Sequence, residues 1–532
     1  MNRVARDAGT VAAVTAVARI VGFLRWIVFA WAVGAPGVGT VYQSVNTVPN
    51  IVYEVAVGGI LAAVVVPLVA ARIGSAGGEH ADDVASALLT RTVVVLLPLT
   101  LIVAAASPLV SRALLGELGV DGAVGLGTRL LLLFSPQVVL YGLGIVVAGV
   151  LQAHRRFLAA ALAPMLSSLV VIATYVAWSL TVPEGTSPGT VTTGELLLLG
   201  GGTTLGVVVM SVPLLFVAAR AGIRLRPRWH LEADTAARAR ALAGAGVAAL
   251  IAQQIGVIVT LSVANRSGGD GTLVVQNYVQ ALYLLPYAVL AVPVATAVFP
   301  VLAASVTAPR GDQEAATRTL AGSLRTVVLL SGAAVGGLIA AAQPIGSVFE
   351  AIDRDGGSRA LDAMPAAILA MAPGLIGFAI TAVGLRALYA RGRALLAGGV
   401  MAIGWLVAAA IPLVVLGPDE GPHRTLVTLG AASSIGMWIA GLGLLARVRH
   451  DWGTGALVGL PWSSALAFVG VLAGSLVHLL ADGRWPTSVA GATGVGAVAG
   501  LAVAGSVLLV GVIADPAVRN RVPGLRGRRA DR

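Results

Sequence analysis

Residues 18–34, ARIVGFLRWIVFAWAVG, set two arginines in a segment that is otherwise apolar. A helix that crosses a bilayer needs about 20 largely apolar residues, and this stretch continues apolar sequence on its N-terminal side. An arginine keeps its charge, and placing one at the bilayer centre costs from about 3 to above 10 kcal/mol. Such residues are expected to face a cavity or an opposite charge. The stretch predicts a membrane helix in which Arg19 and Arg25 have a polar partner or ligand.

The composition places the whole chain in the membrane class. Of its 532 residues, 57% are hydrophobic and 11% are charged, with a mean hydropathy of +0.92. Soluble domains carry about 25% charged residues, so we predict an all-α integral membrane protein. The net charge of +11 is then explained by the positive-inside rule and by anionic lipid headgroups, and we expect no nucleic-acid partner. The absence of cysteine excludes disulfides, iron–sulfur clusters and thiolate zinc sites.

Hydropathy predicts about fourteen transmembrane helices. The second and eighth spans are longer than a bilayer requires and contain prolines, so we expect them to tilt or kink. The spans are expected at residues 11–33, 42–70, 87–107, 128–151, 159–181, 195–219, 241–264, 273–304, 320–343, 365–388, 395–416, 426–446, 458–480 and 488–513.

The arginines predict how the chain is oriented in the membrane. Every basic residue is arginine, and with a cytoplasmic N-terminus 26 of them fall in inside segments against seven in outside loops. Cytoplasmic loops carry the excess of positive charge in membrane proteins. We therefore expect a multi-pass protein of the cell (plasma) membrane with both termini in the cytoplasm.

Internal similarity divides the predicted spans into two lobes. Residues 151–160 (LQAHRRFLAA) and 388–397 (LYARGRALLA) share their spacing at an offset of 237, and Pro49 and Pro286 differ by the same number. Such repeats are common in transporters. The expected domains are an N-terminal six-helix lobe (1–219), a basic cytoplasmic connector (220–240), a pseudo-symmetric C-terminal six-helix lobe (241–450), two additional helices (451–514) and a basic cytoplasmic tail (515–532).

Few ionisable residues lie inside the expected spans, and three of them share the first lobe. Arg19 and Arg25 lie in the first span and Glu54 in the second. Six residues rotate a helix by about 600°, so the two arginines project roughly 120° apart unless Gly22 permits a bend. One carboxylate cannot neutralise two guanidinium groups. Either Glu54 pairs with one arginine and joins the first two spans, or both arginines bind an anion such as phosphate.

Two prolines mark candidate hinges. In TVPNIV (47–52), Pro49 removes a hydrogen-bond donor from the second span, and the side chains of Asn46 and Asn50 can bond carbonyl groups that lose their partners. Pro286 is the expected counterpart in the eighth span. Each proline marks either a packing kink or a gating hinge.

No catalytic constellation is evident. The six histidines are scattered, and the sequence contains no phosphate-binding loop, zinc motif or nucleophile elbow. We therefore expect no enzymatic activity, no cofactor and no metal site.

The first two spans carry motifs of a known family. The pattern resembles that of the MurJ/MviN family of lipid II flippases: ARIVGFLR, then a glycine-rich turn, then VPN…GG…VVVPLVA. This family belongs to the multidrug/oligosaccharidyl-lipid/polysaccharide exporter superfamily. Residues 131–166 are similar to the fourth and fifth spans of actinobacterial members, and the resemblance extends to about residue 450. It implies two lobes around a cationic cavity, a groove for the polyprenyl tail formed by the last two spans, and binding of the lipid pyrophosphate by Arg19 and Arg25.

The chain departs from the family pattern at several positions. Trp26 stands where proteobacterial relatives carry aspartate, while Tyr53, beside Glu54, and Ala281 stand where they carry arginine. Carboxylates that bind sodium in the seventh and eleventh spans of some members have no counterpart. The candidate substrate-binding residues are Arg19, Arg25, Glu54, Asn50, Asn46 and Tyr53, and the candidate hinges are Gly22, Pro49 and Pro286.

Three functions are compatible with the sequence. The resemblance favours a flippase that moves a polyprenyl-pyrophosphate-linked peptidoglycan precursor, lipid II, from the inner to the outer leaflet by alternating access. A cation-coupled multidrug exporter would need a titratable carboxylate, for which Glu54 is the candidate. A non-transporting scaffold of the cell-wall assembly complex is the third. The expected partners are the lipid-linked precursor, membrane lipids and proteins of cell-wall synthesis or division.

Overall fold

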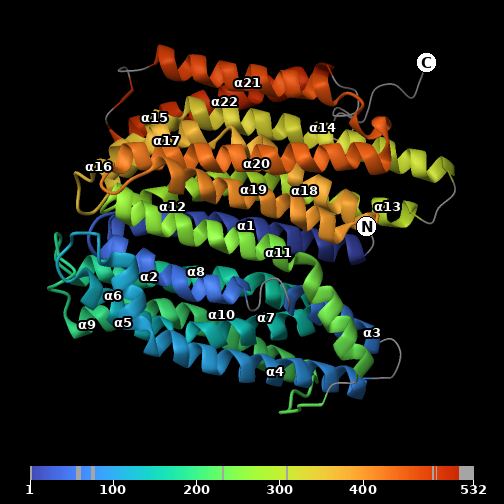
Figure 1. The fold of residues 1–532 in the computed structure, drawn as a ribbon, viewed down its shortest axis with the longest axis horizontal. Coiled ribbons are helices and arrows are strands. Elements are labelled where there is room, and N and C mark those ends of the chain that lie inside the picture. The colour runs from blue at the N-terminus through green and yellow to red at the C-terminus, as the bar shows by residue number, and fades with distance from the viewer. Residues whose placement is uncertain are drawn as a thin grey trace. The chain divides into compact units, whose positions relative to one another are not determined.

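The chain folds almost entirely into α-helices in a computed structural model that describes residues 3–55, 61–73, 78–230, 233–306, 310–481, 485–486 and 488–514 (Figure 1). No β-strand occurs in these residues, which confirms the predicted all-α class. Contacts between Cα atoms divide the chain into two compact units, one made of Met1–Val274 with Asp353–Ser358, the other of Val275–Ile352 with Arg359–Arg532. The lobe, connector and tail boundaries expected from the sequence stay predictions.

The helices of the first unit follow one another with short connections. They are α1 (Arg3–Ala32), α2 (Val38–Tyr53), α3 (Leu61–Ile73), α4 (Gly78–Ala105), α5 (Ser107–Leu115), α6 (Ala123–Phe134), α7 (Gln137–Ala153), α8 (Phe157–Thr181), α9 (Thr193–Leu196), α10 (Gly202–Arg220) and α11 (Ala233–Val263), with π-helical turns η2 (Leu197–Gly201) and η3 (Ala264–Gly268).

The second unit begins at Val275, inside α12. Its helices are α12 (Thr272–Pro286), α13 (Val292–Ser305), α14 (Arg310–Ala340), α15 (Ala342–Ile352), α16 (Arg359–Asp362), α17 (Met364–Met371), α18 (Gly374–Ala390), α19 (Ala394–Val415), α20 (Pro422–Trp452), α21 (Leu460–Leu480) and α22 (Val489–Ala514), with a π-helical turn η4 (Tyr287–Ala291) and a 3₁₀ turn η5 (Thr454–Leu457).

The hydropathy prediction of the spans is largely confirmed. Eleven helices of the described chain are long and apolar enough to cross a membrane, or twelve if the bent pair α17–α18, which turns by 42°, is one span. These twelve coincide with the third to fourteenth expected spans. The first and second expected spans correspond to α1 and to the segment of α2 and α3, which are not among them. The count of fourteen therefore stays a prediction.

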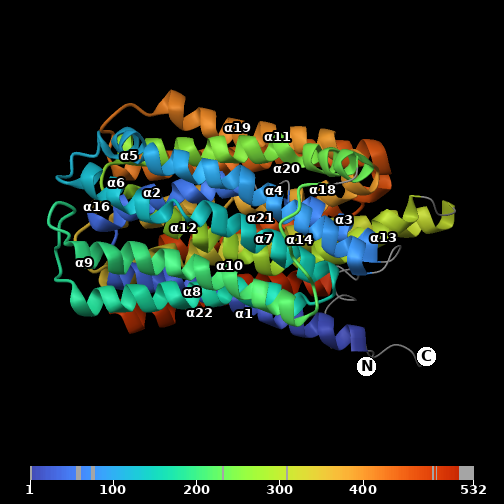
Figure 2. The same cartoon turned by 90° about the horizontal axis from the view of Figure 1, so that it is seen from below.

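Both units bury apolar helix faces against their neighbours. In the first, α1 packs on α8, while α10 packs on α7 and α8, which lie side by side with it in both views (Figures 1 and 2). In the second, α14 packs on α21 and α22, and α20 packs on α18 and α19. Since lipid is as apolar as a leucine side chain, such helices associate mainly through close packing and hydrogen bonds.

The predicted internal repeat is supported by matching turns. The helix pairs α7–α8 and α18–α19 are joined by the two sequences that share the 237-residue offset. In the first turn the amide of Arg156 donates to the carbonyl of Leu151 at 2.8 Å, and in the second Arg393 donates to Leu388 at 2.9 Å. Arg155 has φ 59° where the equivalent Gly392 has φ 70°, so both turns close with a left-handed residue.

Close glycine contacts hold α18 against α20. A Cβ atom on Gly377 would lie 2.7 Å from the carbonyl oxygen of Met437, and one on Gly441 would lie 2.7 Å from the carbonyl oxygen of Gly377. These neighbours are backbone atoms, which can give way only if the helices move apart. The indole of Trp438 also donates to the carbonyl of Pro373 at 3.0 Å. The α18–α20 packing thus depends on glycine at these positions.

The substitution Gly377→Ala is therefore expected to destabilise the second unit. Overpacking of this kind typically costs about 1–3 kcal/mol. Gly399→Ala in α19 is the matched control, because nothing lies within 4 Å of its added methyl group. Reversible unfolding in detergent should show a lower free energy of unfolding for Gly377→Ala than for the unsubstituted protein, and no decrease for Gly399→Ala. Equal stability of the two variants would contradict the packing described for α18 and α20.

Candidate functional site

Arg25 lies in the C-terminal third of α1. Its side chain is half-buried, and the guanidinium is close enough to the hydroxyl groups of Tyr42 and Tyr141 to interact with both electrostatically. Tyr42 lies on α2 and Tyr141 on α7, so the charge acts on groups from two other helices. No ion pair to Arg25 is found among the described residues. Arg25 is thus a half-buried cation with two tyrosine hydroxyl groups in electrostatic range and no ion pair among the described residues.

A buried aromatic cluster fixes the position of Tyr42. Its ring packs at 5.6 Å from those of Phe29 and Phe134. Its hydroxyl lies 3.0 Å from the hydroxyl of Tyr175 on α8 and 2.9 Å from Oγ1 of Thr203 on α10. Buried polar groups that are all hydrogen-bonded rigidify a core. The cluster therefore holds one wall beside Arg25 in a single arrangement.

Arg19 and Glu54 do not join Arg25 in one cluster. The side chain of Arg19 is exposed and that of Glu54 is half-buried, and among the described residues no ion pair joins Glu54 to either arginine. The helix rotation of roughly 120° between the arginines explains why they differ in burial. The alternative in which Glu54 pairs with one arginine is not realised in this structure. A common anion site for both arginines stays a prediction.

The candidate hinge in α2 shows a local rearrangement of hydrogen bonds. Pro49 lies inside α2, and residues 54 and 55 continue it as a π-helical turn. The side-chain amide of Asn50 donates to the carbonyl oxygen of Asn46 at 3.0 Å. The side-chain oxygen of Asn46 is buried without a hydrogen-bond partner in the described chain. The side chain of Tyr53 lies outside the described residues.

Pro286, like Pro49, precedes a π-helical turn, but at a shorter distance along the chain. It is the last residue of α12 and is followed directly by the π-helical turn η4. A π-helical turn inserts an extra residue into the helical ladder and is common at functional sites. Gly22, by contrast, lies within the unbroken helix α1, and a Cβ atom there would meet nothing within 4 Å. Hinge motion at the three positions stays a prediction.

A polar cluster at the turn between α1 and α2 was not predicted. The amide of Ala35 donates to Asp353 Oδ1 at 2.8 Å, and the guanidinium of Arg354 donates to the carbonyl oxygen of Ala32 at 3.0 Å. The amide of Gly37 donates to both carboxylate oxygens of Asp270, at 2.9 and 2.8 Å. The glycine-rich turn GAPGVGT (34–40) was the available signal, because such turns expose amides to anionic groups.

Burial changes the chemistry of Asp353 in this cluster. Its pKa is raised to about 7, mainly because it is removed from water; the hydrogen bond from Ala35 opposes the rise and the nearby Asp355 adds to it. The pKa of Asp355 is raised mainly by burial as well. We define Asp353–Ser358 as the docking segment, since it folds as part of the first unit. Its attachment to the α1–α2 turn is therefore sensitive to pH.

One position that departs from the family pattern adjoins Arg25 and adds no charge to it. Trp26 lies beside it, with the guanidinium carbon of Arg25 5.8 Å from the indole centroid. Ala281, another departure from the pattern, lies in α12 of the second unit. Arg25 is suited to bind an anion, because a guanidinium donates paired hydrogen bonds to phosphate oxygens and the tyrosine hydroxyls add neutral donors.

Comparisons with known proteins identify the family of the chain. A family model described as "Lipid II flippase MurJ" matches residues 29–492. A "Probable lipid II flippase MurJ" from Rhizobium tropici is 27% identical over 300 residues, which is 56% of this chain and 54% of the relative. One from Rhizobium meliloti (strain 1021) is 25% identical over 340 residues, 63% of this chain and 61% of the relative. The matches thus span about half to three fifths of these curated relatives.

Solved structures share the fold. "Lipid II flippase MurJ, inward closed conformation" is similar with a TM-score of 0.72 at 18% identity, covering 95% of this chain and all of that one. An inward-facing multidrug resistance MATE family transporter of the MOP superfamily has a TM-score of 0.65 at 14% identity, covering 83% of this chain and 96% of its own. The family model covers well over half of the sequence, so this multi-pass membrane protein belongs to the lipid II flippase MurJ family.

Proposed function

We propose that the protein moves lipid II, a polyprenyl-pyrophosphate-linked peptidoglycan precursor, from the inner to the outer leaflet of the plasma membrane. The observation that carries the proposal is Arg25, a charge kept half-buried in an apolar helix without a carboxylate partner in the described chain. An unpaired intramembrane cation is costly and marks a substrate pathway in transporters. Membership of a transporter family favours translocation over catalysis.

The pyrophosphate of the substrate supplies the charge that Arg25 lacks. As it leaves water, it exchanges hydration for hydrogen bonds from the guanidinium and from nearby hydroxyls such as that of Tyr141. Arg19, which is exposed on the same helix, is placed to meet the anion earlier or later on its path. The π-helical turns that follow Pro49 and Pro286 provide points at which each helix can bend during alternating access. The inside orientation of both termini belongs to this proposal.

The membrane potential is a suitable driving force. A net-positive binding site gains or loses about 2.3 kcal/mol per elementary charge for each 100 mV that the charge crosses. Glu54 does not neutralise either arginine in this structure, so the first unit keeps its positive intramembrane charge. The proposal therefore predicts that transport responds to membrane potential in addition to any coupling ion.

A cation-coupled multidrug exporter is the second candidate. The fold similarity to MATE transporters favours it, although at 14% identity this similarity establishes only the fold. Exporters of cationic drugs would require an anionic site, whereas the charge next to Tyr42 and Tyr141 is positive. The site therefore favours an anionic substrate.

Depletion of the protein in its own cells distinguishes these functions. Lipid II should accumulate in the inner leaflet and lose its accessibility to an external lipid II-cleaving enzyme, while the efflux of cationic dyes stays unchanged. Loss of dye efflux with normal accessibility of lipid II would replace the flippase with the exporter.

A further inference from the structure

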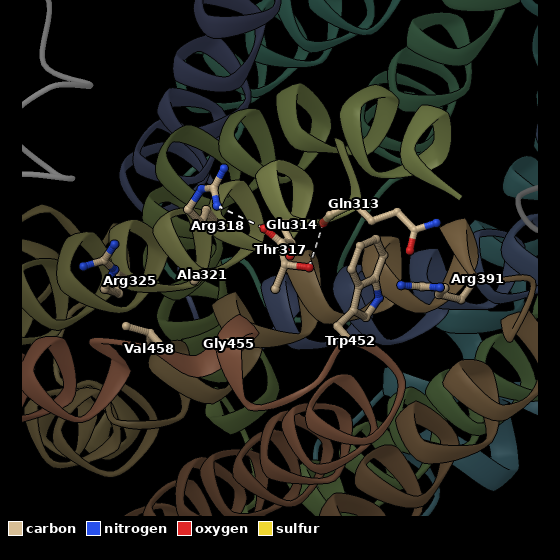
Figure 3. A pocket seen from close by; sticks show the side chains of 10 residues that line it. All are labelled: Gln313, Glu314, Thr317, Arg318, Ala321, Arg325, Arg391, Trp452, Gly455 and Val458. Carbon is tan, nitrogen blue, oxygen red and sulfur yellow. Dashed lines mark hydrogen bonds and ion pairs between the residues drawn. The ribbon is translucent and has the colours of Figure 1, made fainter. Parts of the chain in front are cut away.

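The second unit contains a basic pocket far along the sequence from Arg25. The pocket has a volume of about 880 Å³ and opens between α14, the end of α18, the end of α20 and η5 (Figure 3). Its lining residues are Gln313, Glu314, Thr317, Arg318, Ala321, Arg325, Arg391, Trp452, Gly455 and Val458. The lining includes three arginines and one glutamate, so it carries a net charge of about +2 at neutral pH.

Arg391 is fixed in this pocket by the indole of Trp452. Its guanidinium carbon lies 4.3 Å from the ring centroid, and the indole donates to the carbonyl of Ala387 at 3.1 Å, which holds the ring in place. The Nε atom of Arg391 is buried without a hydrogen-bond partner in the described chain. Figure 3 shows Arg391 beside Trp452 with the side chain of Gln313 close by. A guanidinium held in this way is prepared to donate to an anion.

The other arginines come from one helix face. Arg318 and Arg325 lie seven residues apart on α14, and this spacing returns a helix to nearly the same side. The side chain of Arg325 passes across Gly459. A Cβ atom built on Gly459 would lie 2.7 Å from Cδ of Arg325. Arg318 is 4.0 Å from Glu314, but both side chains are about three-quarters exposed, so this ion pair neutralises little of the charge.

Aromatic residues at the ends of two helices that both pack on α14 indicate how deep the pocket lies in the membrane. Tyr389 in the last turn of α18 is 41% exposed, and Trp462 in the first turn of α21 is 54% exposed. Exposed tyrosine and tryptophan at helix ends are enriched at the level of lipid headgroups. The arginine distribution predicts that this side is cytoplasmic. Basic pockets between membrane helices at this depth suit phosphate groups.

We propose that this pocket binds a phosphate-bearing ligand, with Arg391 and Arg318 as its donors. The phosphate is carried either by an anionic phospholipid headgroup or by a small soluble anion, and both offer the same oxygen acceptors to the guanidinium groups. The site is separate from the lipid II site proposed above, and its occupancy does not depend on flipping.

Two probes applied to the purified full-length protein test the proposal. Native mass spectrometry would count bound phosphatidylglycerol against zwitterionic phosphatidylcholine, and calorimetry would measure binding of inorganic phosphate. Arg391→Gln and Arg318→Gln are each expected to weaken binding of the preferred probe by about ten- to a hundredfold. Arg393→Gln is the matched control, because this exposed arginine lies in the same turn as Arg391 but does not line the pocket.

The outcomes separate the two sources of phosphate. Loss of phosphatidylglycerol from the two pocket variants but not from Arg393→Gln would identify a lipid headgroup. The same pattern with inorganic phosphate alone would identify a soluble anion. Equal binding of both probes by all four proteins, or binding of neither probe by the unsubstituted protein, would overturn the proposal. Arg318→Gln keeps the test decisive if Arg391→Gln does not fold, because the Arg318 side chain is 73% exposed.

Discussion

Arg25→Ala is expected to reduce lipid II flipping by about ten- to a hundredfold while leaving membrane insertion intact. A charge-assisted hydrogen bond typically contributes about 1.5–3 kcal/mol, and the loss of one such contact changes affinity by this factor. Little redundancy remains, since Tyr53 and Ala281 stand where relatives carry arginine. Arg25→Lys should rescue only in part, because an ammonium group lacks the paired donors of guanidinium. Complementation of a flippase-depleted strain, with protein levels checked by immunoblot, measures the effect.

Two comparisons make this result interpretable. Arg19→Ala should also impair flipping, but less than Arg25→Ala, because Arg19 is exposed whereas Arg25 is half-buried. Arg112→Ala is the control, since it removes the same charge from an exposed position on α5 of that unit. Full growth with both Arg19→Ala and Arg25→Ala at normal protein levels would contradict the role of the arginines. It would favour a scaffold in the cell-wall assembly complex.

The docking segment is expected to loosen as pH rises. Because Asp353 has a pKa of about 7 when docked and an ordinary value of 3.8 when exposed, the docked state binds the proton more tightly. Docking is therefore fully stabilised below about pH 4 and loses this contribution as pH rises through about 7. Between pH 5.5 and 8 the protection of the Ala35 amide should fall by roughly thirtyfold. Hydrogen–deuterium exchange, corrected for the intrinsic pH dependence of exchange, measures the protection of this amide.

Asp353→Asn isolates the titrating group. It keeps an oxygen that accepts from Ala35 but removes the charge, so protection should become nearly independent of pH. Asp121→Asn, in an exposed loop of the same unit, should leave the pH dependence unchanged. Persistence of the full pH dependence in Asp353→Asn would show that a different group titrates. The charged neighbours Arg354, Asp355 and Glu184 would then be the next to substitute.

The sequence predicted the fold more completely than the site, for physical reasons. A helix that spans lipid must be apolar over its whole length, so hydropathy located twelve of the expected spans. The expected repeat was suggested by the spacing of two turns, and both turns have a left-handed residue at the same place, although one is Arg155 and the other Gly392. Pro49 and Pro286 were chosen as candidate hinges because proline cannot donate to the helix ladder, yet α2 continues through Pro49 to Tyr53.

The contacts of the site depended on information that spacing does not contain. Helix rotation separated Arg19 from Arg25, but it did not reveal that Arg25 would meet Tyr42 and Tyr141 on two other helices. The docking of Asp353 on Ala35 joins residues 318 positions apart. Nothing in the local sequence near Asp353 indicates that partner. The basic pocket was missed because its arginines were interpreted only as markers of the cytoplasmic side.

Reconstitution of the purified protein with lipid II in liposomes tests the central claim most directly. An external enzyme that cleaves lipid II would report the fraction of substrate that reaches the outer leaflet, with an imposed membrane potential as a second variable. The account predicts that the unsubstituted protein and Arg112→Ala make nearly all the lipid II accessible, that Arg25→Ala slows this by at least about tenfold, and that potential changes the rate. Accessibility that stays at half, as in protein-free liposomes, or an equal rate with Arg25→Ala, would contradict it.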